Sequence, residues 1–265
     1  MAKTLLITLI LLSTIGARSA RFELIKKVKL PADRFTVDIM GQVYWQQDER
    51  LIRYNPLNGQ KQSYSNSFLG AIHSWDASNP LKTLVFHRDF NTLVFLDKNF
   101  GQIRSPINLD QLGVNRASAC CISHQGGFWL VDPPSGQLLH FGPNLSIQHE
   151  SAVISELTAR QNHSPLIRES NKRIYCLVPN CCILIFDRFG NVLRRRPLKN
   201  VDNIQMLNQN IYYFYDGRLF AMNKALQGKK QVKLPPTNGK WDFARMGTQN
   251  MLYLLKNHQL YIFKT

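Results

Sequence analysis

The sequence predicts an all-β fold built from six similar units, and three observations support this prediction. A pair of short strands recurs six times, each pair with an aromatic residue at an equivalent position. These aromatic residues are spaced 42, 43, 46, 37 and 41 residues apart. No stretch after the first twenty residues has the periodicity of a long helix. Repeats of about forty residues made of short antiparallel strands are typical of a β-propeller, so we predict six blades.

The strand pairs follow one another along the whole chain. They cover residues 42–55, 82–97, 127–142, 173–187, 210–223 and 251–264, and their equivalent aromatic residues are Tyr44, Phe86, Trp129, Tyr175, Tyr212 and Tyr253. A further strand precedes each pair, as in RFTVDIM, NIQML and WDFARM, and we expect it at the inner edge of the blade. The outer strands expected for units one to five are KQSYS, QIRSPI, SIQHESAVI, VLRRRPLK and GKKQVKL. A helical turn fits only at residues 151–161.

The two ends of the chain complement each other. The last unit ends at Thr265 after three strands, whereas RFELIKKVKL near the start is a strand with no partner before it. If this strand takes the outer place in the last blade, the ring closes and leaves no unpaired edge. We therefore predict a single domain over residues 20–265. The alternative, a β-sandwich followed by a smaller β-domain, leaves the regular spacing and the spare strand unexplained.

The first nineteen residues have the pattern of a secretory signal peptide. Lys3 precedes an apolar run, and the small residues Ala17 and Ser19 follow it. A membrane anchor is the alternative, but the run is shorter than the roughly 20 residues that a span needs. We expect cleavage after Ser19 and export of the protein, with no transmembrane span in the remainder.

The chain is strongly basic. Its net charge is +16, with 33 Lys and Arg against 17 Asp and Glu. Such a surplus favours anionic partners, and export argues against nucleic acid among them. The charge gathers in the outer strands expected for blades four to six, at Arg194, Arg195, Arg196, Lys199, Lys229, Lys230, Lys233, Lys26, Lys27 and Lys29. These residues form either a docking surface or a solvated rim whose lysines discourage edge pairing.

The sequence contains no motif of a hydrolase, a phosphate-binding loop or a zinc protease. His73 and Ser74 are neighbours on an expected strand and point to opposite faces, so they cannot act as a catalytic pair. A tryptophan precedes an aspartate near two expected inner strands. The candidates for a ligand site at the channel mouth are therefore Trp75, Asp76, Trp241 and Asp242. Turn capping is the simpler interpretation of Asp38, Asp76 and Asp242.

The five cysteines include two adjacent pairs, at Cys120, Cys121, Cys176, Cys181 and Cys182. An odd number with adjacent members is a poor framework for a disulfide-stabilised fold. The nearest histidines do not complete a zinc set either. We expect buried free thiols, with one disulfide bridge as the alternative, and we predict no metal or cofactor.

The segment WDASNPLKTLVFHRDFNTLVFLD, with the later GGFWLVD and NHQLYIFK, resembles a largely uncharacterised family of exported six-bladed propellers of Bacteroidetes-type bacteria. That resemblance implies a Gram-negative envelope location and supports the propeller, but it offers no catalytic residue to transfer. The segment itself reads as one blade, in which Asn79-Pro80 is a turn and residues 88–91 join the two middle strands.

These observations together favour a non-catalytic, exported propeller that serves as a binding platform in the bacterial cell envelope. Its basic rim would meet an envelope protein or an anionic envelope surface. The alternative is a propeller enzyme or carbohydrate-binding protein that uses the channel mouth.

Overall fold

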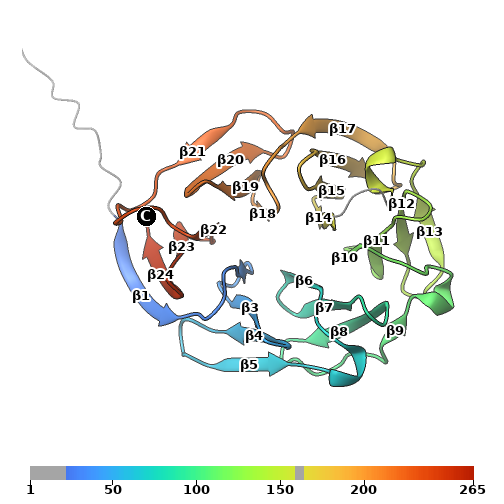
Figure 1. Cartoon of the computed structure of the whole chain (residues 1–265), viewed down its shortest axis with the longest axis horizontal. Helices are drawn as coiled ribbons and strands as arrows, with labels where there is room; N and C mark the ends of the chain where they lie inside the picture. The colour runs from blue at the N-terminus through green and yellow to red at the C-terminus, as the bar shows by residue number, and fades with distance from the viewer. Residues whose placement is uncertain (1–21, 159–163) are drawn as a thin grey trace, which may run out of the picture.

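The computed structural model describes residues 22–158 and 164–265, which form six four-stranded antiparallel sheets arranged in a ring (Figure 1). We number the sheets as blades 1 to 6. From the inner to the outer edge, blade 1 contains β2 (Thr36–Val37), β3 (Val43–Gln47), β4 (Arg50–Tyr54) and β5 (Lys61–Tyr64); blade 2 contains β6 (Ser74–Asn79), β7 (Lys82–His87), β8 (Thr92–Asp97) and β9 (Ile107–Asn108); blade 3 contains β10 (Ala119–Ile122), β11 (Phe128–Asp132), β12 (Gln137–Phe141) and β13 (Ile147–Glu150).

Blade 4 contains β14 (Leu166–Ser170), β15 (Arg173–Val178), β16 (Cys182–Asp187) and β17 (Val192–Pro197); blade 5 contains β18 (Ile204–Leu207), β19 (Asn210–Tyr215), β20 (Arg218–Asn223) and β21 (Lys230–Val232); blade 6 contains β22 (Phe243–Met246), β23 (Met251–Lys256), β24 (Gln259–Lys264) and β1 (Glu23–Lys29). The predicted six-bladed propeller and its six hairpins are thus confirmed. The signal peptide predicted at residues 1–19 lies outside the described residues.

Turn residues explain why the middle strands fold back where they do. The turns between them contain residues with positive φ at equivalent places, and these residues are Asp48, Asn91, Gly136, Asn180, Asp216, Gly217, Asn257 and His258. Gly, Asn and Asp adopt this left-handed conformation at the lowest steric cost. All these turns, and the connections between blades, lie on one side of the ring, which we call the turn face.

The ring closes as the termini predict. β1 pairs antiparallel with β24, with Val28 opposite Leu260 and Lys26 opposite Ile262. The backbone N–H of Leu30 extends the pairing by donating to the carbonyl oxygen of His258 at 2.8 Å. Figure 1 shows the N-terminal strand on the outer edge beside the last hairpin, so the first and last parts of the chain share one sheet.

One outer strand differs from its prediction. The sequence predicts the outer strand of blade 2 at residues 102–107, but only an isolated bridge between Leu96 and Gln102 forms there, and β9 begins at Ile107. Pro106 lies between these pairings and has no backbone N–H to donate to a ladder. Arg104 and Ser105, directly before it, therefore form no ladder pair with β8.

Short 3₁₀ helices connect the first four blades. They are η1 (Ser67–Leu69), η2 (Asp110–Leu112) and η3 (Ser155–Leu157). The last of them lies in the segment where a helical turn was expected, but the other two show that the expectation of a single turn was wrong. A three-residue turn leaves no hydrophobic periodicity in a sequence, so it escapes detection.

The core consists of apolar layers between neighbouring blades. The equivalent aromatic residues of the repeat are buried except for Tyr212, which is half-buried. Cys120 and Cys121 are adjacent on β10 and point into two different layers, because successive residues of a strand face opposite sides. All five cysteines are free thiols, and all but Cys181 are buried.

Candidate functional site

The predicted basic residues lie on neighbouring outer strands. β17, β21 and β1 are the outermost strands of blades 4, 5 and 6, and they follow one another along the edge of the ring (Figure 1). We call the residues on and beside these strands the basic belt: Arg194, Arg195, Arg196, Lys199, Lys229, Lys230, Lys233, Lys26, Lys27 and Lys29. The outer strands of blades 1 to 3 carry one basic residue of the Lys or Arg type, Lys61 of β5.

The belt side chains are well exposed and mostly not neutralised. Lys26 and Arg196 are half-buried, and the other members are exposed. Arg195 forms an ion pair with Glu156 at 2.8 Å, and within the described part of the chain it is the one belt residue that does so. Arg194 donates to the carbonyl oxygen of Ala225 at 3.2 Å. Because carboxylates are so few here, the positive charge of the belt remains available to a partner.

Arginines also line a groove of about 340 Å³ between the edges of blades 4 and 5. Arg194, Arg195 and Arg196 form one side of it, and the loop Ala225–Gln227 forms the other. The Arg196 side chain donates to the carbonyl oxygen of Leu226, which holds it against this loop. The groove is therefore a preformed concave part of the belt.

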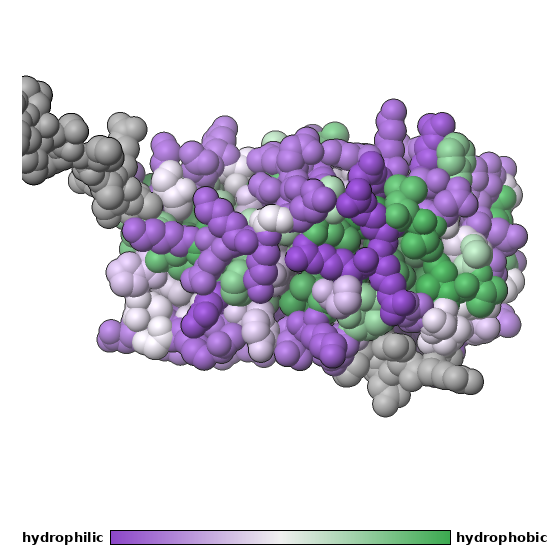
Figure 2. Space-filling model, turned by 90° about the horizontal axis from the view of Figure 1, so that it is seen from above, coloured by the Kyte–Doolittle hydropathy of each residue, from purple (hydrophilic) through white to green (hydrophobic). Residues whose placement is uncertain are grey.

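Exposed apolar residues accompany the charges at two equivalent places. The register skips Ile25 in β1 and Leu193 in β17, which marks a β-bulge near the start of both strands. The exposed apolar side chains at these bulges are Leu24 (50%), Ile25 (49%), Val192 (47%) and Leu193 (47%). Two basic residues follow each apolar pair directly. Figure 2 shows the edge at the top of Figure 1, where hydrophilic side chains project beside an apolar area.

The two tryptophan–aspartate pairs do not form one site. Asp76 is fully buried near the axis of the ring, where its oxygens accept the backbone N–H groups of Ser78 and Ile122, each at 3.0 Å. Arg168 lies 3.6 Å from it. Trp75 is half-buried, and its indole N–H donates to Thr36 Oγ1 at 3.1 Å. Both residues thus hold inner strands together.

Trp241 lies elsewhere, contrary to its expected position at the channel mouth. It is 7% exposed, and its indole N–H donates to the carbonyl oxygen of Pro235 at 3.0 Å. The rings of Tyr261 and Phe263 meet it edge-on at 5.5 and 6.3 Å. An indole placed before β22 is drawn into this aromatic layer because burying its large apolar surface is favourable.

Asp242 and Asp38 have separate surroundings. Asp242 accepts the backbone N–H of Asn257 at 2.7 Å and lines a pocket of about 540 Å³ on the turn face. Asp38 is buried and accepts the backbone N–H groups of Met40 and Gln42, each at 2.9 Å, and the hydroxyl of Tyr44 at 3.0 Å. Burial raises the pKa of Asp38. Both aspartates accept backbone N–H groups of turns, as the turn-capping interpretation expects.

The inner strands carry charged residues that the sequence interpretation missed. Glu169 on β14 accepts the indole N–H of Trp129 at 3.0 Å and the backbone N–H of His124 at 3.2 Å. Arg245 on β22 is 1% exposed. Both occur in strands with alternating apolar residues, and only the pairing of the sheets places them inward.

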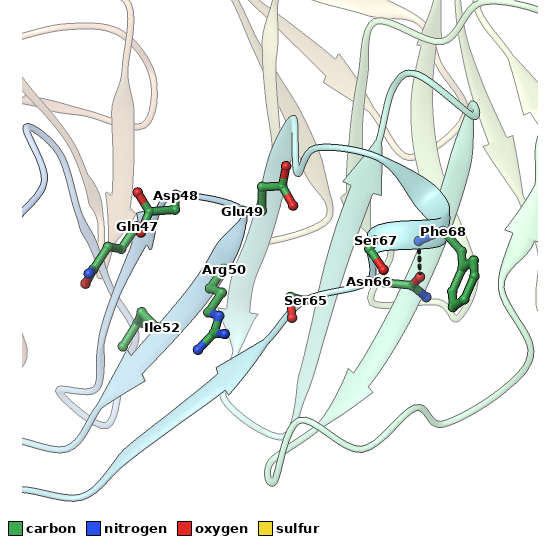
Figure 3. A pocket seen from close by; sticks show the side chains of 9 residues that line it. All are labelled: Gln47, Asp48, Glu49, Arg50, Ile52, Ser65, Asn66, Ser67 and Phe68. Atoms are coloured by element: carbon green, nitrogen blue, oxygen red, sulfur yellow. Dashed lines mark hydrogen bonds between the residues drawn. The ribbon is translucent and has the colours of Figure 1, made fainter.

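The turn face also contains depressions lined by polar residues. One of about 850 Å³ lies between the β3–β4 turn and the loop after β5. Figure 3 shows Gln47 to Arg50 on one side of it and the segment 65–68 on the other, with the Phe68 ring pointing away. Asn66 Oδ1 accepts the backbone N–H of Phe68 at 3.1 Å and fixes this loop. Polar turn residues gave no sequence signal for such a depression.

Residues 22–158 and 164–265 contain neither a cluster of metal ligands nor a membrane-spanning helix. No three Cys, His, Asp or Glu side chains among them converge to hold a metal ion. No helix in that part of the chain is long and apolar enough to cross a bilayer.

Comparisons with known proteins agree on the architecture. No protein-family model matches the chain, and no curated protein matches it. A streptogramin B lyase is similar in structure with a TM-score of 0.59 and 11% identity, over 92% of this chain and 97% of that one. Virginiamycin B lyase from Staphylococcus aureus is similar with a TM-score of 0.57 and 12% sequence identity, over 92% of this chain and 89% of that one. A chain of a mitotic checkpoint complex is similar with a TM-score of 0.62 and 10% sequence identity, over 100% of this chain and 99% of that one. At these identities the likeness identifies the fold as that of a β-propeller and assigns no activity.

Proposed function

We propose that this protein is a non-catalytic binding platform of the bacterial cell envelope, which docks an acidic envelope protein on the basic belt. The observation that carries the proposal is the concentration of Lys and Arg on and beside the outer strands of three consecutive blades, where, within the described residues, only Arg195 has an ion-pair partner. The signal-peptide pattern of residues 1–19 supports export, and the resemblance of residues 75–97 to exported propellers supports the periplasm or the outer envelope of a Gram-negative bacterium as the destination.

The shape of the belt favours a protein partner over a flat lipid surface. β17, β21 and β1 follow the curved edge of the ring (Figure 1). A plane touches such an edge over part of its length, whereas a folded protein can follow the curve. The apolar pairs Leu24-Ile25 and Val192-Leu193 add surface that protein interfaces desolvate, and arginine is enriched at such interfaces.

The comparisons are compatible with this role without assigning it. One similar structure is a chain of a mitotic checkpoint complex, which is a protein assembly. Two others are lyases, so the fold by itself does not choose between a platform and an enzyme. The channel-mouth alternative has less support, since Trp241 is buried and both indole N–H groups are already bonded.

The test is charge reversal in the belt. The triple variant Arg194→Glu, Arg195→Glu, Arg196→Glu is compared with a control that reverses Lys61, Lys98 and Arg104. The control residues are exposed and lie on blades 1 and 2, and both variants change the net charge equally. Purified, immobilised protein is exposed to envelope extract at low and high salt, and bound proteins are quantified.

We expect the belt variant to lose its main acidic protein partner and the control to keep it. The retained amount should fall as salt rises, because exposed charges are screened over about 10 Å at 0.1 M. Equal retention by both variants would show that the belt is only a solvated rim. Belt-dependent retention on anionic vesicles, with no protein retained, would replace the protein partner by a lipid surface.

A further inference from the structure

A buried arginine lies near the axis of the ring with no acidic partner. Arg245 lines a cavity of about 70 Å³ together with residues of β2, β6, β14 and β18. Its Nη2 donates to Asn203 Oδ1, and the Phe243 ring centre lies 4.6 Å from its guanidinium carbon. Its Nη1 is buried and has no hydrogen-bond partner in the described structure. One guanidinium group is thus incompletely satisfied in the interior.

The other charged side chains around the cavity each contact a side chain of complementary type. Asp76 faces Arg168 at 3.6 Å, and Glu169 faces His124 Nδ1 at 3.5 Å. Both carboxylates also accept backbone N–H groups. Arg245 is therefore the charged side chain of the cavity lining that has no ion-pair partner among the described residues. Burial, with the charges of Arg168 and Arg34, lowers the pKa of Arg245 to about 9, so the side chain remains charged at neutral pH.

A buried charge without a counter-ion costs several kcal/mol, which arginine cannot avoid by releasing its proton at neutral pH. We propose that the cavity binds one small monovalent anion, of the size of chloride, on the Nη1 atom of Arg245. The volume of about 70 Å³ equals that of roughly two waters, which suits a monatomic anion or a single small carboxylate.

Neutral donors beside Arg245 complete the site. Thr36 lines the cavity, and its hydroxyl oxygen accepts the indole N–H of Trp75, so its own proton is left to donate. Asn203 presents its oxygen to Arg245, so its amide N–H₂ remains for the anion. Because the lining comes from inner strands of five blades, a bound anion stabilises the closed ring. This role is independent of the basic belt.

The first experiment measures thermal unfolding of the whole mature protein in sodium chloride at constant ionic strength. Sodium gluconate replaces the chloride, because gluconate is too large for the cavity. We expect the unfolding temperature to rise by about 4 °C between no chloride and ten times its dissociation constant. If the unfolding temperature is the same in chloride and in gluconate, the proposal is overturned.

Two variants locate the effect. Asn203→Asp places a carboxylate against Arg245, so it should raise the unfolding temperature without chloride and abolish the chloride dependence. Arg245→Met removes the charge and should also abolish that dependence. If Arg245→Met fails to fold, Asn203→Asp still decides the matter. A chloride dependence that persists in Asn203→Asp at full size means that the anion binds elsewhere.

Bromide gives a direct view. Crystals grown in sodium bromide should show an anomalous peak beside Arg245 Nη1, and crystals of Asn203→Asp should lack it. Bromide found only on the exposed belt, with the cavity occupied by water, rejects the site.

Discussion

The Arg168 guanidinium lies 3.6 Å from the Asp76 carboxylate and joins blade 4 to blade 2, while Asp76 also accepts the backbone N–H of Ile122 in blade 3. One buried carboxylate thus ties the inner strands of three consecutive blades. In a closed ring this contact bridges elements that are about ninety residues apart in the chain, as in the bond from Arg168 to the carbonyl oxygen of Trp75.

We expect Asp76→Asn to destabilise the protein by about 2 to 4 kcal/mol, because it removes the charge that faces Arg168 and leaves a buried N–H without an acceptor. Asp97→Asn is the control. Asp97 caps a turn by accepting the backbone N–H groups of Asn99 and Gly101, so its change should cost about 1 kcal/mol. Urea unfolding measures both. Equal losses would contradict a special role for Asp76.

The closing strand makes a prediction about proline. Leu30 donates its N–H to His258, the residue directly before β24. Alternate residues of a strand donate on the same side, so the N–H of Val28 faces β24. Val28→Pro should therefore cost about 3 kcal/mol or more, since it removes a bond of the ladder. Lys27→Pro should cost much less, because the N–H of Lys27 faces outward. Urea unfolding measures the loss of stability in the two variants. A larger loss in Lys27→Pro than in Val28→Pro would refute the register in which β1 pairs with β24.

The pair His124–Glu169 should make stability depend on pH. The hydrogen bond that His124 donates to Glu169 raises the pKa of His124 above 6.5. Burial works to raise the pKa of Glu169, but the bonds from His124 outweigh it and hold that pKa below 4.5. The histidine contribution is complete below pH 6.5 and fades as pH rises, while the glutamate contribution is complete above pH 4.5 and fades as pH falls.

The stabilisation by this pair should thus be greatest between about pH 4.5 and 6.5. Since the His124 side chain is 63% exposed, we expect only about 0.5 kcal/mol. His124→Gln should be less stable than the unmodified protein at about pH 5.5, and the gap should shrink at about pH 8.5. Urea midpoints at the two pH values measure the gap. A gap that widens on going to alkaline pH would contradict the assignment.

The cysteines should differ sharply in reactivity. Cys181 is partly exposed, whereas burial raises the pKa of Cys120, Cys121 and Cys176, and that of Cys182 to about 12. The thiolate is the reactive form, so iodoacetamide should modify one cysteine of the native protein quickly. Mass spectrometry of the labelled peptides identifies it. Cys181→Ser should remove the fast reaction, and rapid labelling of Cys120 instead would show that blade 3 opens.

The sequence allowed most of the architecture to be predicted because the information is local. The hairpins depend on short apolar strands and on turn residues such as Asp48 and Asn257 that tolerate positive φ. The outer strand of blade 2 was predicted at the wrong residues. Pro106 interrupts its pairing with β8, and the sequence alone does not show which residues of β8 would pair with it. Trp241 was misplaced for a related reason, since its aromatic partners Tyr261 and Phe263 lie on β24.

The sequence by itself determined the number of blades, the closure by the N-terminal strand and the adjacency of the basic strands. All three follow from repeats and from the unpaired ends of the chain. Only the tertiary structure decided which polar residues lie inside. Arg245 and Glu169 reach the interior through contacts with strands of other blades, so their burial, their pairing and the charge left on Arg245 depend on pairs distant in the chain. Local patterns do not encode such long-range contacts, because the ring brings the inner strands together only once it has closed.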